Sequence, residues 1–410
     1  MPDHRCRFCG AQLEQIFVDL GLSPLANAHR DVNDLNEDQP RYPLQVYVCD
    51  QCFLVQLPSY ETPEELFSDY SYFSSYSQSW LDHCRDFSQS VTARFGFEPT
   101  SRIVEIASND GYLLQCFQKQ GFEVLGIEPA ANVARVAMDK GIRTEVMFFG
   151  VEAARQLVAR GHKADLLIGN NVLAHVPDLN DFVAGTKLLL ADEGLITMEF
   201  PHLLCLMEQG QFDTIYQEHY SYFAFLVAEK VFATHGLRVF DVEQLWTHGG
   251  SLRIYGCHLQ ARHTTETRVA EMRAIELQAG LSCLEAYRGF DRKVQAVKSG
   301  LLEFLVGARR AGKRVAGYGA PAKSTTLLNY CGIDVDLLEF TVDRSPHKQG
   351  RFIPGTRIPI YEPQRIMECR PDYVLVLPWN IKGEVMNQMS GIADWGGKFV
   401  IPGPRLVVCE

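Results

Sequence analysis

The fold class of this chain is decided by the stretch RIVEIASNDG, residues 102–111. It begins with an apolar run of strand length and breaks at Asn-Asp-Gly, which is a turn signal. The next segment, YLLQCFQKQG at residues 112–121, has helical periodicity and closes on a glycine. A second strand, FEVLGIEP, follows at residues 122–129. The order strand, helix, strand predicts an α/β protein with parallel strands.

The same alternation continues along the chain. We expect helices at residues 130–141, 147–161 and 181–194, and strands at residues 164–171 and 195–200. This pattern is typical of a doubly wound parallel sheet, whose ligands bind at the carboxyl ends of the strands. The sequence therefore predicts a ligand site at that edge.

Acidic residues stand at the ends of the first two strands. Glu105 ends the first, Asp110 and Gly111 open the following helix, and Glu128 and Pro129 end the second. A carboxylate there can accept hydrogen bonds from ribose hydroxyls, and helix N-terminal amides can approach a ligand. The glycine fingerprint that binds a pyrophosphate is absent, which argues against a dehydrogenase. Acidic residues often end strands, but the combination favours a nucleoside without a pyrophosphate, such as S-adenosylmethionine.

The segment NNVLAHVPD follows the strand at 164–171. Asn170 and Asn171 are expected to contact an adenine or the methionyl part of the cofactor, and His175 to project into the cleft. The alternative is an Asx-rich loop with a histidine that is satisfied within it.

Another candidate site is FDTIYQEHYSYFAF, Phe212 to Phe225. In a helix, Tyr216 and His219 would share a face, whereas in a strand Tyr216 and Glu218 would align. In both cases a phenol, a carboxylate and an imidazole lie just past the strand at 195–200. The imidazole could serve as a base and the phenol as a donor to an oxyanion. The alternative is aromatic packing with a single charge.

Four cysteines form two CxxC pairs, Cys6 with Cys9 and Cys49 with Cys52. Each pair can direct two thiolates to one point, and four thiolates suit a closed tetrahedral zinc site. We therefore predict structural zinc, with a redox pair as the alternative. The other eight cysteines are scattered singly, as in a reducing compartment.

Composition limits the function further. The chain has 410 residues, enough for two or three domains, and a formal net charge of −11, which argues against a nucleic-acid partner. No apolar run reaches the roughly 20 residues of a membrane helix. We expect a cytoplasmic protein without a membrane partner, and a monomer. The Tyr- and Ser-rich run near residues 67–80 is either a polar surface loop or a lid over a ligand.

A second α/β pattern begins at residue 313 with KRVAGYGAPAKSTTLLNYCG. Its glycine turn places Lys323 early in a helix, and a lysine near helix N-terminal amides suits a diphosphate. Lys348, in SPHKQGRFIPG, is another candidate phosphate or loop contact. The alternative is a Rossmann-like scaffold whose lysines are only solvated.

In combination, these motifs resemble one family. CxxC…CxxC, VEIASNDG, GIEP, NNVLAHVPD, FDTIYQEHYSYF, THGG, GYGAPAKS and DRSPHKQGRFIPG occur in one order, from Cys6 to about Asn380. They resemble the S-adenosylmethionine-dependent sugar C-methyltransferases of deoxysugar biosynthesis. The resemblance implies a zinc-binding domain at residues 1–70, a class I methyltransferase core at 71–240 and a C-terminal Rossmann-like domain at 241–410. The implied substrate is a nucleotide-linked 4-keto-deoxysugar, with dTDP or GDP, methylated at C3 through an enolate.

The resemblance also implies roles for the residues of the I-Y-x-E-H motif. His219 would be the base and Tyr216 the donor to the enolate oxygen, while Glu218 would orient one of them or a substrate hydroxyl. His175 is expected near the keto sugar.

Further residues are implied around this centre. Tyr72 and Ser74 would help to close the pocket, and His248 is an additional substrate contact. One departure is Ala107, which stands where the family usually has glycine and narrows the freedom in φ. The alternatives are a methyltransferase acting on oxygen or nitrogen and a non-catalytic nucleotide-sugar binder.

Overall fold

The computed structural model describes residues 4–67, 75, 77–403 and 405–409. The chain forms two compact units. The first comprises Met1–Glu14, Cys49–Leu204 and Tyr220–Ala286, and the second comprises Gln15–Val48, Cys205–His219 and Tyr287–Glu410. The division into domains at residues 1–70, 71–240 and 241–410 stays a prediction.

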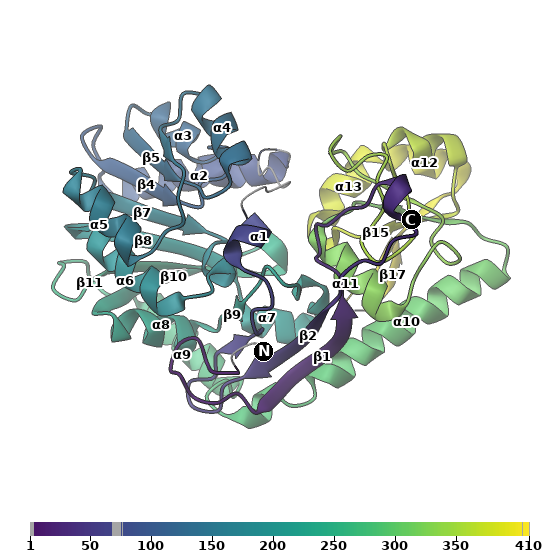
Figure 1. Cartoon of the computed structure of the whole chain (residues 1–410), viewed down its shortest axis with the longest axis horizontal. Coiled ribbons are helices and arrows are strands. Elements are labelled where there is room, and N and C mark those ends of the chain that lie inside the picture. The colour runs from purple at the N-terminus through teal and green to yellow at the C-terminus, as the bar shows by residue number, and fades with distance from the viewer. Residues whose placement is uncertain (1–3, 68–74, 76, 404, 410) are drawn as a thin grey trace. The chain divides into compact units, whose positions relative to one another are not determined.

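The first unit contains a seven-stranded sheet in the order β10-β11-β8-β7-β4-β5-β6 (Figure 1). The strands from β8 to β6 are parallel, and β11 and β10 add an antiparallel edge. The predicted doubly wound parallel sheet is therefore confirmed, with an antiparallel pair added at one edge. Its strands are β4 (Arg102–Ile106), β5 (Glu123–Ile127), β6 (Thr144–Glu145), β7 (Ala164–Asn170), β8 (Leu190–Pro201), β10 (Leu237–Leu245) and β11 (Ser251–His258).

Helices alternate with these strands. One face of the sheet is covered by a core cluster that includes Phe87 of α2, Phe117 of α3 and Ala137 of α4, packed on Ile103 and Leu166. The helices of this unit are α1 (Pro63–Phe67), α2 (Gln78–Phe95), α3 (Leu114–Gln118), α4 (Ala131–Asp139), α5 (Val151–Ala159), α6 (Leu179–Leu189), α8 (Phe225–Thr234) and α9 (Thr267–Gln278), with short 3-10 turns η3 (Leu173–His175), η5 (Thr247–Gly249) and η6 (Leu284–Tyr287). A two-stranded pair, β3 (Val55–Gln56) with β9 (Ser221–Tyr222), completes it.

One predicted boundary is wrong. Residues 190–194, expected to end a helix, belong to β8, because Leu190 pairs with Ala164 of β7. A Cβ at Gly194 would lie 2.7 Å from the carbonyl oxygen of Ala164, so only glycine lets the strands approach this closely. The helical pattern of α6 therefore stops at Leu189.

The second unit holds a six-stranded sheet in the order β14-β13-β12-β15-β16-β17, parallel except for β17. This confirms the predicted Rossmann-like α/β fold near the C-terminus. Its strands are β12 (Val315–Tyr318), β13 (Thr341–Val342), β14 (Ile360–Tyr361), β15 (Tyr373–Val376), β16 (Lys398–Ile401) and β17 (Val407–Cys409). An antiparallel hairpin, β1 (Gln15–Ser23) with β2 (Tyr42–Val48), also belongs to this unit.

The helices of the second unit follow the same alternation. The core beneath them includes Val374, Val376, Phe399 and Ile366. The helices are most of α7 (Leu203–Gln209), then α10 (Phe290–Arg310), α11 (Ala322–Cys331), α12 (Gln364–Cys369) and α13 (Lys382–Gln388), with short 3-10 turns η1 (Val32–Asp34), η4 (Phe212–Thr214), η7 (Trp379–Ile381) and η8 (Ser390–Trp395).

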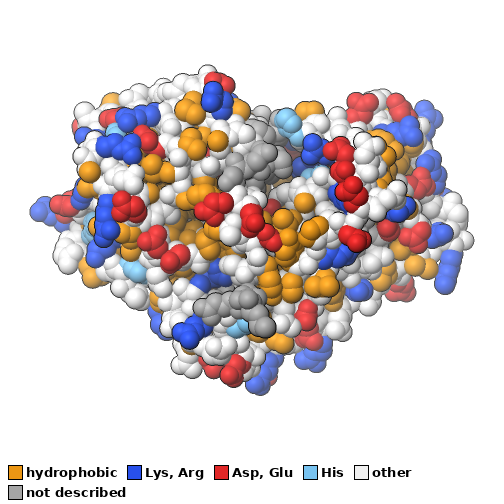
Figure 2. All heavy atoms as spheres, viewed as in Figure 1, with side chains coloured by type: hydrophobic (Ala, Val, Ile, Leu, Met, Phe, Trp, Pro, Cys, Tyr) orange, Lys and Arg blue, Asp and Glu red, His pale blue; other side chains and the backbone are white. Residues whose placement is uncertain are grey.

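The surface mixes charges of both signs. Figure 2 shows acidic and basic side chains interspersed among apolar ones on the viewed face. Across the described ranges, no helix combines the length and the apolar character that crossing a bilayer requires.

Candidate functional site

The four cysteines of the two CxxC pairs converge in the first unit. The Sγ atoms of Cys6 and Cys52 lie 3.5 Å apart, as do those of Cys9 and Cys49, and all four lie within 4.8 Å of one another. A zinc ion with Zn–S bonds of about 2.3 Å requires sulfur atoms about 3.8 Å apart. The cluster therefore fits tetrahedral zinc.

The two CxxC pairs form the same kind of backbone turn. The amide of Gly10 donates to the carbonyl of Cys6 at 2.9 Å, and the amide of Phe53 donates to the carbonyl of Cys49 at 2.9 Å. Both donors have positive φ, 75° at Gly10 and 64° at Phe53. Glycine accepts this conformation readily, whereas Phe53 adopts it at a cost that the cluster offsets.

The turn after β4 forms the floor of the predicted cofactor site. Ala107 and Asn109 both have left-handed backbones, with φ of 55° and 49°. The Glu128 carboxylate at the end of β5 accepts hydrogen bonds from the amides of Asn109 and Ala130, each at 2.9 Å. Burial raises the pKa of Glu128, while these two donors lower it. These hydrogen bonds hold the turn after β4 together with Glu128, the residue predicted to bind the ribose.

Glu105 and Asp110 occupy different environments in this site. Glu105 is fully buried within β4, and burial raises its pKa well above the ordinary range, which favours the neutral acid. Asp110 accepts hydrogen bonds from Lys140 Nζ at 3.1 Å and from Ser75 Oγ. Gly111, with φ of 75°, packs against Ile142. Asp110 therefore stabilises this turn through its hydrogen bonds, in addition to its predicted role in binding the cofactor.

Buried polar atoms at this edge fit a bound cofactor. Asn170 ends β7, and within the described part of the chain neither its Oδ1 nor its Nδ2 has a hydrogen-bond partner. The same holds for Ser108 Oγ and Asp110 Oδ1. A buried polar group without a partner costs roughly 1–3 kcal/mol. The amine, carboxylate and hydroxyl groups of S-adenosylmethionine would satisfy such atoms.

The loop after β10 meets the loop after β7. Asn171 has a φ of 54°, and its Nδ2 lies 3.1 Å from Nε2 of His248, whose own φ is 53°. The His248 ring is 5.5 Å from the indole of Trp80. His248, predicted as a substrate contact, therefore lies beside a predicted cofactor residue.

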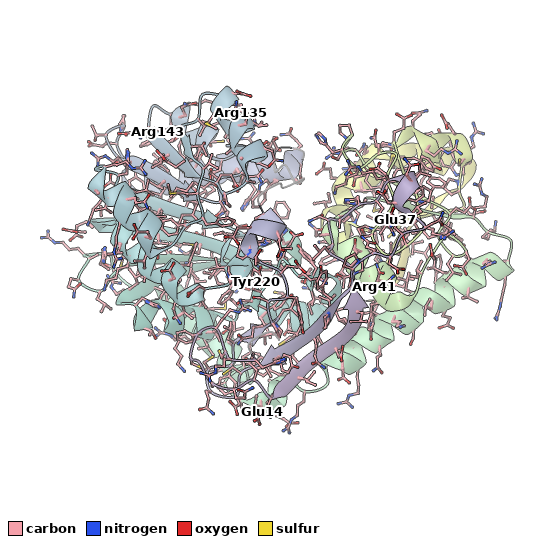
Figure 3. All side chains as sticks on the ribbon, in the orientation of Figure 1. Glu14, Glu37, Arg41, Arg135, Arg143 and Tyr220 are labelled. Carbon is pink, nitrogen blue, oxygen red and sulfur yellow. The ribbon has the colours of Figure 1, made fainter. Side chains whose placement is uncertain are left out.

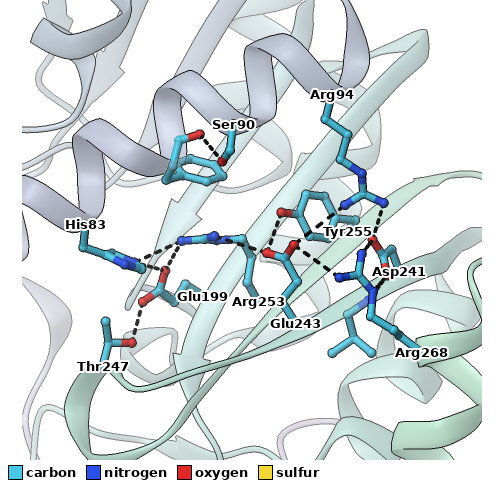
Figure 4. A network of polar contacts seen from close by, with 12 residues as sticks. His83, Ser90, Arg94, Glu199, Asp241, Glu243, Thr247, Arg253, Tyr255 and Arg268 are labelled. Atoms are coloured by element: carbon cyan, nitrogen blue, oxygen red, sulfur yellow. Dashed lines mark hydrogen bonds and ion pairs between the residues drawn. The ribbon is translucent and has the colours of Figure 1, made fainter.

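A buried ion network holds these loops, as Figure 4 shows. Glu199 of β8 accepts hydrogen bonds from Thr247 Oγ1 at 2.7 Å and from Arg253 Nη2 at 2.8 Å, and lies 3.0 Å from His83 Nε2. Burial alone would raise the pKa of Glu199, but His83 and Arg253 lower it to about 2. The amide of Asn171 donates to the Glu199 carbonyl at 2.7 Å. Sequence reasoning missed this network, although Glu199 is an acidic residue at the end of a buried strand.

His175 ends the 3-10 turn η3 in the same unit. Its ring packs edge-on against Phe67 of α1, with centroids 5.7 Å apart. Tyr72 and Ser74, predicted to close the pocket, lie outside the described residues, as does most of the Tyr- and Ser-rich run.

The I-Y-x-E-H motif lies in the second unit, in a turn that is neither helix nor strand. The amide of His219 donates to the carbonyl of Tyr216 at 2.9 Å, and the two rings lie 4.0 Å apart. His219 Nδ1 lies 2.7 Å from the carbonyl oxygen of Thr214. A carbonyl only accepts, so Nδ1 carries the proton and Nε2 the lone pair of the neutral ring.

Glu218 is held by a segment far away in the sequence. Asn27 Nδ2 donates to Glu218 Oε1 at 2.7 Å, and the Asn27 carbonyl lies 3.0 Å from His29 Nδ1. Burial, and then the Lys348 charge, lower the pKa of His29 to about 4. Sequence reasoning missed Asn27 and His29, which lie between the two CxxC pairs in the sequence.

Lys323 and Lys348 flank the glycine turn after β12. Lys323 Nζ donates to Asn380 Oδ1 at 2.7 Å and lies 4.5 Å from the centre of the Trp379 indole. Desolvation lowers the pKa of Lys323, the charge of Asp213 raises it in part, and no carboxylate of the described residues lies within ion-pair distance of its amine. Lys348 Nζ is buried and donates to the Ala320 carbonyl at 2.8 Å. The first lysine is available to an anion, while the second also shapes the turn.

Comparison with known proteins identifies the family. The C-methyltransferase NovU of Streptomyces niveus is 36% identical over 411 residues, covering 100% of this chain and 98% of NovU. The chain belongs to this C-methyltransferase family. Three domain models match this chain: a zinc binding domain at residues 6–67, a methyltransferase domain at residues 80–246 and a C-methyltransferase C-terminal domain at residues 246–404. The protein is therefore an S-adenosylmethionine-dependent C-methyltransferase that binds zinc.

Other relatives match a smaller part of this chain. A ubiquinone biosynthesis O-methyltransferase of Bartonella quintana is 25% identical over 114 residues, which is 28% of this chain and 46% of that protein. The crystal structure of magnesium protoporphyrin IX methyltransferase from Synechocystis PCC 6803 with bound SAM is 14% identical. It covers 44% of this chain and 81% of its own, with a TM-score of 0.35.

Proposed function

We propose that this C-methyltransferase methylates C3 of a nucleotide-linked 4-keto-deoxysugar, with dTDP or GDP as the nucleotide. The keto group acidifies the neighbouring C–H bond, and loss of that proton gives an enolate that attacks the methyl group. S-adenosylmethionine would supply the methyl on its sulfonium: the new C–C bond forms as the S–CH3 bond breaks, and S-adenosylhomocysteine leaves. The protein must then supply a base, an oxyanion donor and an aligned, dry site.

The observation that carries this proposal is the hydrogen bond between His219 Nδ1 and the Thr214 carbonyl, 2.7 Å long. It fixes the tautomer in which Nε2 can accept a proton, and it fixes the plane of the ring. Proton transfer to Nε2 leaves an imidazolium whose Nδ1–H bond to the carbonyl strengthens. His219 is thus suited to remove the C3 proton.

Tyr216 and Glu218 support this step. The Tyr216 ring lies 4.0 Å from the His219 ring, so its phenol is assigned to donate to the developing enolate oxygen. Glu218, fixed by Asn27 at 2.7 Å, is assigned to a substrate hydroxyl or to orienting the motif. His175 is assigned to the keto sugar, and Asn170, Asn171, Glu128 and the turn at 107–111 to the cofactor.

Lys323 is assigned to the diphosphate of the substrate. It stands at the second position of α11, where helix amides point toward an anion, and its amine lacks an ion-pair partner among the described residues. Lys348 adds a positive charge beside the same turn, whereas His29, whose pKa is lowered to about 4, is neutral at pH 7. The second unit would then bind the nucleotide end of the substrate.

Turnover tests the activity. Purified protein with S-adenosylmethionine and a panel of dTDP- and GDP-linked keto-deoxysugars should give a product heavier by one methylene, with the new methyl on C3 by NMR. A methyl on oxygen or nitrogen would contradict the proposal, as would inactivity across the panel.

Replacing His219 tests the base. We expect His219→Gln to lower kcat by a factor of about 10²–10⁴, the usual contribution of a general base. Calorimetric affinity for S-adenosylhomocysteine should stay within twofold. His162→Gln is the matched control, since His162 contacts Arg143 away from the motif. Near wild-type turnover in the His219 variant would reject this assignment.

A further inference from the structure

Arg7 lies between two zinc ligands, Cys6 and Cys9, yet its side chain points into the methyltransferase part of the first unit. Its Nη2 donates to the Leu57 carbonyl at 2.5 Å and its Nη1 to the Pro177 carbonyl at 3.2 Å. The guanidinium carbon lies 5.2 Å from the centre of the Tyr220 ring. One side chain therefore joins three segments of the unit.

The backbone of Arg7 is fixed equally closely to the metal cluster. Its amide donates to Gln56 Oε1 at 2.9 Å, and Gln56 Nε2 lies 3.1 Å from Cys6 Sγ. On the other side, Asn180 Nδ2 donates to the Arg7 carbonyl at 3.3 Å and to the Phe8 carbonyl at 2.9 Å. Thus Gln56 links Arg7 to a thiolate, and Asn180 links it to helix α6.

The segments that Arg7 joins carry proposed catalytic groups. Tyr220, labelled in Figure 3, is buried with 1% of its surface exposed, and its amide donates to the Ala174 carbonyl at 2.8 Å. The Leu57 amide donates to the Tyr220 carbonyl at 2.9 Å. Ala174 precedes His175 in the chain, and Tyr220 follows His219. The Arg7 contacts therefore fix the backbone next to both histidines.

The charge of Arg7 also fits this place. Arg7 is half-buried, its Nε is buried without a hydrogen-bond partner, and no carboxylate of the described residues lies within ion-pair distance of it. Four thiolates around one Zn²⁺ carry a formal charge of about −2. Arg7 interacts electrostatically with Cys6, and its planar fork supplies two diverging donors, which a lysine cannot reproduce.

We propose that Arg7 is a positioning residue through which the zinc knuckle holds the His175 loop and the backbone at Tyr220 in their working arrangement. Zinc then contributes to the alignment of the reaction as well as to folding of the N-terminal region. The catalytic consequence rests on the proposed function, whereas the structural coupling does not.

Three variants test this coupling without requiring turnover: Arg7→Met, Arg7→Lys and the control Arg5→Met, whose arginine is exposed beside the same knuckle. Zinc per chain is measured by mass spectrometry, and hydrogen exchange reports on amides 172–180 and 219–222. We expect Arg7→Met to keep its zinc and to lose about tenfold in protection at these amides. Arg7→Lys should recover part of the protection, because it keeps the charge and one donor, and the control should match the wild type.

Two outcomes would overturn the proposal. One is wild-type protection in zinc-loaded Arg7→Met. The other is loss of zinc from both Arg7 variants, which would make Arg7 a residue that only retains the metal.

Kinetics then test the consequence for catalysis. We expect Arg7→Met to lower kcat about tenfold with KM and cofactor affinity within twofold, since small misplacements of reacting groups are costly. An unchanged kcat beside lost protection would overturn the catalytic part of the proposal. If no sugar is turned over by the wild type, the proposed function fails, and the exchange result still decides the coupling.

Discussion

At the residue scale, the cofactor edge of the first unit concentrates backbone conformations that L-amino acids seldom adopt. Ala107, Asn109, Asn171 and His248 all have φ between 49° and 55°. Asparagine tolerates this region, because its side chain can bond locally, but alanine does not share that advantage. Such residues persist where the surrounding structure over-determines them, and they cluster at ligand sites.

Ala107→Gly should therefore stabilise the protein. The left-handed conformation costs an alanine about 1–2 kcal/mol, which glycine avoids. The greater freedom of glycine in the unfolded chain opposes this gain by about 0.4–1 kcal/mol. We expect a net gain of about 0.5–1 kcal/mol in the free energy of unfolding, measured by urea titration. Ala159→Gly, at the exposed last residue of helix α5, is the control with an ordinary helical backbone and should not gain stability. A stability loss at position 107 would contradict this account.

At the element scale, the antiparallel pair β10–β11 does more than extend the sheet. Its connecting loop carries Thr247 and His248, and β11 carries Arg253, which reaches Glu199 on β8. The loop after β7 is bonded to the same strand through Asn171. Glu199 thus contacts two loops of the cofactor edge, and Figure 4 shows the contact with Thr247.

Glu199→Gln should destabilise this unit markedly. Removing one partner of a buried ion pair typically costs about 3–5 kcal/mol. The folded-state pKa of Glu199 is lowered to about 2, so its contribution is complete above the unfolded-state pKa and is lost as pH falls through about 2. The stability difference between wild type and variant, from urea titrations, should be large at pH 7 and shrink below about pH 4. A difference that does not change with pH would show that the charge of Glu199 is not responsible.

The control for this experiment is Glu123→Gln, on exposed Glu123 at the start of β5. Exposed ion pairs contribute about 0–1 kcal/mol, so the control should stay close to wild type at both pH values.

At the scale of the whole molecule, the chain crosses repeatedly between its two compact units. The zinc cysteines and the methyltransferase sheet belong to one unit, while the I-Y-x-E-H motif and the C-terminal sheet belong to the other. Each unit can therefore be tested for its own ligand, the cofactor for the first and the nucleotide for the second.

Lys323→Met tests the assignment of the nucleotide to the second unit. Loss of a cation that contacts phosphate should raise KM for the nucleotide sugar about tenfold or more, with kcat within threefold. The reason is that this contact would stabilise the bound substrate and the transition state equally. Cofactor affinity by calorimetry should not change. Lys313→Met is the control, because Lys313 precedes β12, at the opposite end from Lys323, and pairs with Asp372. An unchanged KM in the Lys323 variant would leave the anion role without support.

Much of the fold followed from local pattern. The strands around residues 102–129 and the helix after each were predicted because apolar periodicity and turn residues are written into short segments. The four zinc cysteines were predictable because their spacing is itself the signal. The end of α6 was not, because pairing between β7 and β8 overrides the helical pattern of residues 190–194.

The sequence by itself determined the two α/β patterns, the zinc cysteines and the candidate groups Tyr216, Glu218 and His219. Only the tertiary structure decided which partners these groups meet. Asn27 and Glu218 lie 191 positions apart, and Arg7 and Pro177 lie 170 apart. Local periodicity carries no information on such pairs, because their distance depends on the path of the whole chain. The tautomer of His219 likewise depends on the tertiary structure. It is set by the carbonyl of Thr214, which His219 meets in a turn, whereas the sequence pattern had suggested a helix or a strand.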